Sequence, residues 1–294
     1  MDGIVNSLTG AFTLAFVVTS MFGLGLGLTV RDIIQPLANP GLVARALLAS
    51  FVIVPAAAWA ITRLFPLRQD LQIGLLLMAT VAGAPLALKA TEIARGDVRF
   101  SVALVTLQVV VSVIYLPIVV PWLFPGIAVN AVELAIPLVL QILVPLALGL
   151  AMHLRYDEEA EMARPIMTEI ANLSLAALLV TNLANVRHVV RLIGTGAFAA
   201  SLSVIALALF AGYLLGGSGR PRRRALALGT GQRNFAAAFV IAEESFSDRP
   251  VVMLMLLAAS LLSLAVILVV AGEFGRRAKT RGDTATSGDA RVAA

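Results

Sequence analysis

Two basic side chains lie inside long apolar stretches, each beside residues that break helices. Lys89 comes four residues after the run Ala82–Pro85 (Ala-Gly-Ala-Pro), and Arg233 lies within the run Gly229–Asn234 (Gly-Thr-Gly-Gln-Arg-Asn). Proline removes a helix hydrogen bond and glycine permits unusual dihedral angles, so we expect both runs to be unwound. A charge at membrane depth is costly and usually marks function, so Lys89 and Arg233 are the first candidates for a binding site.

The composition indicates that these stretches belong to a membrane protein. Sixty per cent of the 294 residues are apolar, only 13% are charged, and the mean hydropathy is +0.95. A soluble domain keeps about a quarter of its residues charged. The chain has no cysteine, and its two histidines, His153 and His188, are far apart and lack metal-ligand spacing. We therefore expect no enzyme activity, no resident metal and no nucleic-acid partner.

Apolar segments of membrane-spanning length divide the chain. A hydrocarbon core about 30 Å thick needs roughly 20 apolar helical residues. By that length the sequence predicts an all-α integral membrane domain over residues 1–281, followed by a disordered cytoplasmic tail over 282–294. Nine transmembrane helices are expected, near Leu8–Leu28, Leu42–Leu64, Leu71–Arg95, Val98–Phe124, Val132–Leu154, Pro165–Ala184, Gly194–Gly216, Arg224–Glu243 and Val251–Phe274.

The basic residues between these segments predict the orientation. With the N-terminus outside, 15 of the 22 basic residues fall on the cytoplasmic side and five on the other, which leaves only Lys89 and Arg233. Cytoplasmic loops carry an excess of Lys and Arg. We therefore expect a multi-pass protein of the plasma or bacterial inner membrane, with the N-terminus outside and the C-terminus in the cytoplasm.

The two interrupted segments are the third and the eighth, so they cross the membrane in opposite directions. Corresponding interrupted helices in two inverted halves indicate the binding site of a secondary transporter. The alternative is that both are ordinary helices with packing glycines. Lys89 and Arg233 would then extend to the interface, since each lies within about 15 Å of a helix end. We favour a functional site because the charge lies beside a helix break in both halves.

At these motifs the sequence resembles the bile acid:sodium symporter family. The matching stretches are Met21–Leu26, Val54-Pro55 with Trp59, Ile93–Asp97, Val144–Gly149 and Gly231–Asn234. The resemblance implies ten spans in two inverted five-helix repeats, with the first helix missing here, so that the repeats cover about 8–124 and 132–274. It also implies a core domain and a panel domain, two crossing discontinuous helices, and a substrate cleft between the domains.

The residues that hold sodium in this family differ in this chain. The resemblance implies that Lys89 lies at or next to the position of an Asn that binds sodium in the family. It also implies that this chain has Gly229 in place of a sodium-binding Glu, and Arg233 and Ser50 in place of two sodium-binding Gln residues. Of two expected hydroxyls, Ser101 is kept and the other falls on Val105, whereas the substrate-facing Asn234 is retained. A fixed cation repels a mobile one, so we expect sodium-independent transport, with Lys89 and Arg233 replacing the two ions. Lys89 could also carry a proton if it were desolvated.

Fixed positive charge in an apolar cleft suits an amphipathic organic carboxylate or sulfate. The remaining candidate site residues are Pro85, Gln108, Asn182, Asn185, Gly229, Thr230, Gly231 and Gln232. For Gln108, Asn182 and Asn185, hydrogen bonding between helices is an equally good interpretation. Two other functions stay open: a proton-coupled efflux carrier for organic acids, and a membrane sensor that binds its ligand without transporting it.

Overall fold

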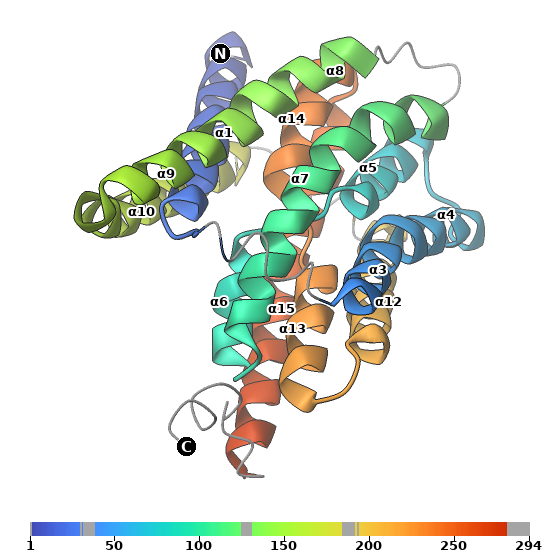
Figure 1. Ribbon diagram of the computed structural model, residues 1–294. Coiled ribbons are helices and arrows are strands. Elements are labelled where there is room, and N and C mark those ends of the chain that lie inside the picture. Colours follow the sequence, from blue (N-terminus) through green and yellow to red (C-terminus); the bar gives the residue numbers. More distant parts are fainter. Residues whose placement is uncertain are drawn as a thin grey trace, which may run out of the picture.

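The computed structural model describes residues 2–29, 31, 39–124, 131–183, 192 and 194–280, and all regular secondary structure in this part is helical (Figure 1). The expected cytoplasmic tail over 282–294 and the candidate residue Asn185 lie outside it. Five described helices are long and apolar enough to cross a membrane, and they cover 40–64, 98–123, 136–155, 197–215 and 250–280.

The helices follow one another in the order of the apolar segments. Their bounds are α1 Asp2–Gly25, α3 Pro40–Leu48, η2 Ala49–Ile53, α4 Val54–Leu64, α5 Gln69–Thr80, α6 Leu86–Ile93, α7 Val98–Leu123, α8 Ala131–Leu138, η3 Val139–Leu143, α9 Val144–Arg155, α10 Asp157–Leu183, α12 Ala197–Leu215, α13 Arg220–Gly231, α14 Phe235–Ser245 and α15 Pro250–Thr280. The chain leaves the helical conformation after α5 and after α13, at the Gly- and Pro-containing runs where the sequence predicts it.

One turn of π-helix, η2, has a clear cause in the sequence. It ends just before Val54-Pro55, and Pro55 has no N–H to donate to the preceding turn. The carbonyls of Ser50 and Phe51, five and four residues earlier, are therefore left without their helical partner. The Tyr115 hydroxyl donates to the Phe51 carbonyl at 2.8 Å, and an arginine takes the Ser50 carbonyl, as described below. Thus Pro55 opens acceptors on the side of the helix that faces α7 and α13.

Helices α1, α9 and α10 pack together in one group, and α3, α4 and α12 lie on the opposite side of the molecule (Figure 1). The first group depends on a close helix contact. A Cβ on Gly149 of α9 would overlap the Phe22 carbonyl oxygen of α1 and would lie 3.0 Å from the Cα of Gly25. The glycine-rich run around Gly25 therefore permits close helix packing.

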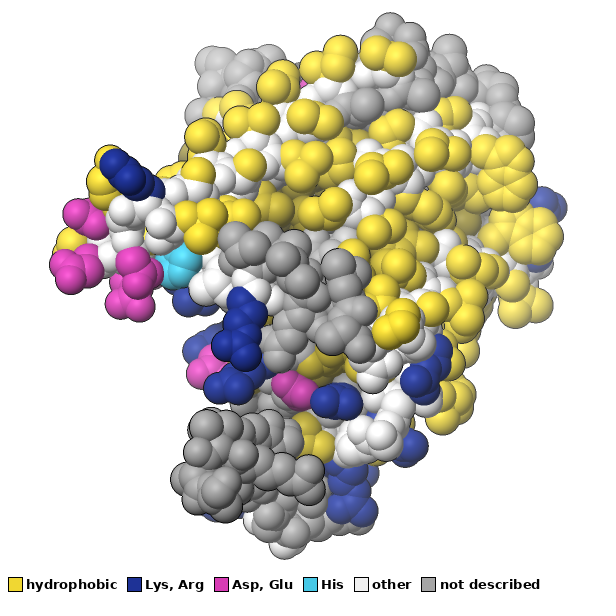
Figure 2. All heavy atoms as spheres, viewed as in Figure 1, with side chains coloured by type: hydrophobic (Ala, Val, Ile, Leu, Met, Phe, Trp, Pro, Cys, Tyr) yellow, Lys and Arg dark blue, Asp and Glu magenta, His cyan; other side chains and the backbone are white. Residues whose placement is uncertain are grey.

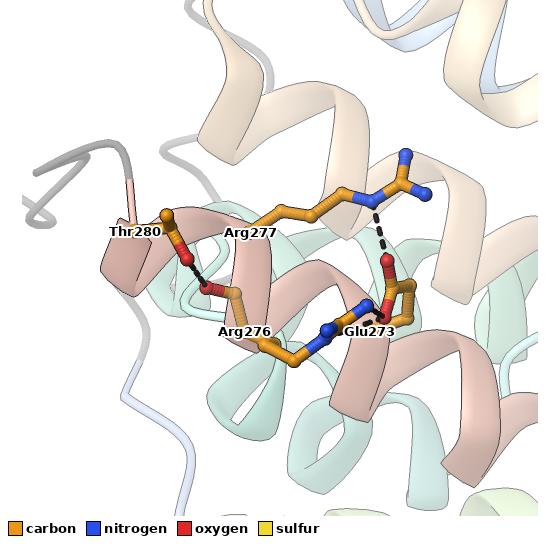
Figure 3. A network of polar contacts seen from close by, with 4 residues as sticks. All are labelled: Glu273, Arg276, Arg277 and Thr280. Atoms are coloured by element: carbon orange, nitrogen blue, oxygen red, sulfur yellow. Dashed lines mark hydrogen bonds and ion pairs between the residues drawn. The ribbon is translucent and has the colours of Figure 1, made fainter.

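The two interrupted helices, α5–α6 and α13–α14, lie among α7, α12 and α15. α15 packs against α5, α6, α12 and α14, and α13 packs against α6, α7 and α12. In Figure 1, α5 and α14 lie in the upper half of the molecule and α6 and α13 in the lower half. The last turns of α15 carry an ion-pair cluster, in which Glu273 accepts hydrogen bonds from Arg276 at 2.9 Å and Arg277 at 2.5 Å (Figure 3). These two basic residues are thus already paired within their own helix.

Candidate functional site

The breaks in the two interrupted helices meet at one point. Between α13 and α14, the Asn234 backbone N–H donates to the Val81 carbonyl at 3.4 Å, and its side-chain Nδ2 donates to the Gly83 carbonyl at 3.1 Å. Its Oδ1 accepts from the Ala237 N–H at 3.2 Å and so caps α14. Gly83 has φ +85°, and a Cβ there would collide with the backbone of Val109. The crossing therefore needs both this asparagine and this glycine.

Arg233 fills the centre of the crossing and is only 1% exposed. Its guanidinium donates to backbone carbonyls alone: Nε to Met78 at 3.3 Å, Nη1 to Thr230 at 3.1 Å, and Nη2 to Ser50 at 3.2 Å and to Ala79. Among the described residues, none of its partners is a carboxylate. A positive charge is therefore held by neutral oxygens from three separate helices.

The position of these oxygens explains how a buried guanidinium is tolerated. Two belong to the last turn of α5 and one to the last turn of α13, where helix carbonyls lack a partner and carry partial negative charge. The oxygen of Ser50 is the one left free by Pro55. A cage of carbonyl oxygens at helix C-terminal ends is also what a transporter offers to a sodium ion. In this structure the guanidinium of Arg233 occupies such a cage.

A line of polar side chains on α7 completes the surroundings of the crossing. Gln108 Nε2 donates to Ser50 Oγ at 2.6 Å, and Ser112 Oγ donates to the Ala82 carbonyl at 3.0 Å. Near the other end of α6, the hydroxyls of Ser101 and Thr91 are 3.0 Å apart. All three α7 side chains are buried. Gln108 binds the widened turn η2, Ser112 binds the unwound run after α5, and Ser101 binds the regular helix α6, so in this structure Gln108 and Ser101 hold helices together.

A cavity of about 760 Å³ lies beside the crossing, between the α1–α10 side and the α6–α14–α15 side. Most of its lining is apolar, including Phe16, Leu24, Leu175, Phe239 and Leu264. Its polar and charged lining residues are Thr19, Ser20, Lys89, Glu92, Arg164, Thr168, Asn172, Gln232, Arg233, Asn234 and Ser260. In Figure 2, charged side chains gather around a hollow on the left of the molecule, whereas hydrophobic side chains cover the upper and right parts.

Lys89 does not lie in the crossing, contrary to the expectation that it replaces a second cation. Its side chain is 69% exposed, and Nζ is 2.8 Å from Glu92 Oε2 on the same helix. The helix break ends at Pro85, so one turn of α6 separates Lys89 from the crossing. The side chain instead lies on the wall of the cavity.

The other predicted residues divide into three sets. Pro85, Gln232 and Asn234 line the cavity with Lys89 and Arg233. Gly229, Thr230 and Gly231 are buried in the last turn of α13 and do not line the cavity, and neither do Gln108 and Ser101. Asn182 lies in α10, but its side chain and all of Asn185 are outside the described part of the chain.

Sequence reasoning missed the polar residues that α10 contributes. Arg164, Thr168 and Asn172 line the cavity from one face of this helix, at intervals of four residues. That spacing is a recognisable signal, because residues four apart lie one above the other on a helix. Arg164 falls one residue before the predicted apolar segment Pro165–Ala184, where a basic residue is typical of a helix end, so this signal competes with a simpler interpretation.

Comparison with known proteins places this architecture in a family. The family model described as "Sodium Bile acid symporter family" matches residues 13–195. The chain is 27% identical over 233 residues to "Probable sodium/metabolite cotransporter BASS2, chloroplastic" of Oryza sativa subsp. japonica, covering 78% of this chain and 55% of that protein. It is 24% identical over 247 residues to the corresponding BASS1 protein of Arabidopsis thaliana, with 83% and 62% covered.

A bacterial relative shows a similar level of identity. The chain is 23% identical over 239 residues to "Uncharacterized sodium-dependent transporter YocS" of Bacillus subtilis (strain 168), covering 77% of this chain and 72% of that protein. It spans only 55% and 62% of the two plant proteins. The family consists of membrane transporters and not of enzymes, in agreement with the expectation from the sequence. This chain belongs to the sodium bile acid symporter family.

Proposed function

We propose that the chain is a secondary transporter of an amphipathic organic anion, and that it works by alternating access without sodium. The observation that carries the proposal is the cage around Arg233, in which backbone oxygens of the crossing bind a cation that is part of the protein. The names of the relatives describe sodium-dependent or sodium/metabolite transport. In this proposal the guanidinium is the decisive difference, because a fixed cation in the cage repels and displaces a mobile ion.

The two helix groups supply the moving parts of the proposed mechanism. In this proposal, α1, α9 and α10 belong to the panel, the interrupted helices and their neighbours form the core, and nine spans build two inverted repeats. The cavity lies where these groups meet, and its volume of about 760 Å³ is in the range of sites for molecules of drug size. An apolar lining with a few cationic groups fits a hydrocarbon body that carries a negative group.

The proposed orientation follows from charge. We propose that the chain lies in the plasma or bacterial inner membrane with its N-terminus outside and its C-terminus in the cytoplasm, since most Lys and Arg residues fall on one side of the predicted spans. The start of α13 and the end of α15 would then lie at the cytoplasmic surface. Both carry clusters of basic residues.

Uptake in proteoliposomes tests the proposal. Labelled taurocholate is presented with sodium or with choline outside, at two pH gradients, to the unaltered chain and to Arg233→Met. We expect flux that ignores sodium and pH gradient and that is lost in the variant. The matched control is Arg155→Gln, an exposed basic residue at the end of α9, which should transport normally. A strict sodium requirement in the unaltered chain would show that the cage does not substitute for the ion.

A further inference from the structure

Three cationic side chains line the cavity, and they differ in how their charge is used. Arg233 donates to four backbone carbonyls. Lys89 is bound to Glu92 at 2.8 Å, so this pair brings no net charge to the cavity. For the side chain of Arg164, the described residues provide neither an ion pair nor a hydrogen bond. Arg164 is therefore the cation whose donors are open to a ligand.

The surroundings of Arg164 hold its guanidinium at the cavity wall. A Cβ on Gly27, in the turn after α1, would lie 2.6 Å from the Arg164 Cζ, so the guanidinium rests on the bare backbone of a glycine. Thr168 and Asn172 follow on the same face of α10 and line the same cavity. The hydroxyl of Thr168 donates to the Arg164 carbonyl at 2.9 Å, which fixes the rotamer of Thr168. The lone pairs of this hydroxyl oxygen can still accept hydrogen bonds from other donors. The amide of Asn172 adds two N–H donors.

We propose that Arg164, assisted by Asn172, binds the anionic group of the substrate on the panel side of the cavity. This inference rests on the proposed transport function and specifies its substrate. A guanidinium presents a planar pair of N–H donors that matches a carboxylate or sulfonate. Because the Lys89–Glu92 pair is neutral and Arg233 is engaged by the backbone, one cation among the described lining residues remains for the ligand. The substrate class is thus a monoanionic organic acid whose apolar body lies against residues such as Phe239 and Leu264.

A phospholipid headgroup offers the same anionic chemistry as such a substrate, and Arg164 lies near the start of a long helix where lipid headgroups occur. The two sources are separated by the choice of bilayer. In nanodiscs of phosphatidylcholine alone no anionic lipid is present, so an anion bound at Arg164 is a soluble one. In nanodiscs containing phosphatidylglycerol, a headgroup that occupied the site would compete with it.

The absence of cysteine in the chain allows a direct electrical test of this site. A single cysteine is introduced as Thr168→Cys, one turn from Arg164, and its reaction rates with an anionic and a cationic methanethiosulfonate reagent are compared at low salt. Side chains four apart on a helix are about 6 Å from each other, and a unit charge at that distance in water changes the ratio of the two rates about tenfold. We expect Arg164→Gln to lower the anion-to-cation ratio by about that factor, whereas Arg155→Gln should leave it unchanged.

Ligand protection supplies the second arm of the experiment. Taurocholate should slow the anionic reagent in phosphatidylcholine nanodiscs when Arg164 is present and should not do so after Arg164→Gln. Arg164→Lys keeps the charge and loses the planar fork, so the rate ratio should persist while protection requires about tenfold more taurocholate. Equal protection in Arg164→Gln, or an unchanged rate ratio, would overturn the inference. Protection that phosphatidylglycerol abolishes would assign the site to lipid and would also overturn it. If the unaltered chain neither takes up taurocholate nor is protected by it from the anionic reagent, the proposed transport of such an anion is wrong. The ratio of the two reagent rates, measured with and without Arg164→Gln, then decides separately whether Arg164 attracts anions.

Discussion

Replacing Arg233 by methionine tests whether a tethered cation organises the crossing. Methionine keeps an unbranched apolar stem but removes the charge and all five N–H donors. The carbonyls of Met78, Ala79, Thr230 and Ser50 then lose their donor in a site that is 1% exposed in the native protein. Because the last turns of α5 and α13 would present unpaired carbonyls to each other, the two helix breaks should separate.

The magnitude follows from the cost of unpaired buried groups. An unsatisfied buried acceptor costs about 1–3 kcal/mol, and here four carbonyls lose their donor. The relief from no longer burying a guanidinium offsets part of the sum over four carbonyls, so we expect a net loss of about 3–5 kcal/mol. With about 2–4 °C per kcal/mol, the melting temperature of the purified protein should fall by about 6–20 °C.

Arg233→Gln turns the same measurement into a test for the ion. The family resemblance implies a glutamine at this position in members that bind sodium. Arg233→Gln removes the positive charge and leaves the carbonyl cage open to a cation. The melting temperature is measured in sodium, potassium and choline chloride at equal ionic strength. We expect no sodium-specific effect on the unaltered chain and a partial recovery by sodium in Arg233→Gln, since a ligand at 100 times its Kd stabilises by about 2.7 kcal/mol. Saturable, sodium-specific stabilisation of the unaltered chain would refute the reasoning.

Three further predictions concern the cavity, the panel and the other face of the core. Glu92→Gln releases Lys89 from its ion pair and should tighten taurocholate binding about two- to fivefold, measured by equilibrium binding in phosphatidylcholine nanodiscs, with no change in melting temperature. Gly149→Val forces a side chain into the backbone of α1 and should cost about 1–3 kcal/mol in thermal unfolding, whereas a substitution at Gly272, where a Cβ meets nothing, is the control. Asp70→Asn breaks a 3.2 Å pair with Arg249 between the starts of α5 and α15, and a double-mutant cycle should give a coupling of about 1 kcal/mol or less because both side chains are partly exposed.

The sequence predicts the helical elements and the position of the crossing well, because both depend on local chemistry. The runs Ala82–Pro85 and Gly229–Asn234 break helices through proline and glycine, and the breaks occur there. The sequence places Arg233 within one of these runs, and the structure shows that its side chain is buried there and does not extend to the interface. The family resemblance added the hypothesis that this position is a cation site, which composition and periodicity do not contain.

Side-chain partners and the far wall of the cavity could not be predicted in the same way. Whether Lys89 points to the crossing or to Glu92 depends on the length of the unwound segment before α6, which one residue more or less would change. The role of Gln108 depends on Pro55, since the π-turn that this proline causes brings Ser50 within 2.6 Å. Arg164 faces the cavity because of how α10 packs on α1, and that rotation depends on glycine contacts between three helices.

A tethered cation also has a consequence for the driving force of transport. In a sodium-coupled carrier the ion assembles the crossing and its gradient drives the substrate, whereas in the proposed mechanism Arg233 assembles the crossing whether or not any ion is present. A monoanion should then move down its own electrochemical gradient. One charge in a potential of 100 mV corresponds to about 2.3 kcal/mol, or roughly a 50-fold concentration ratio. Proteoliposomes whose interior is held positive by a potassium gradient and valinomycin should therefore accumulate labelled taurocholate up to about 50-fold, and vesicles without a potential should only equilibrate it. Accumulation at zero potential in response to a sodium gradient would show that an ion still drives the cycle and that Arg233 does not replace it.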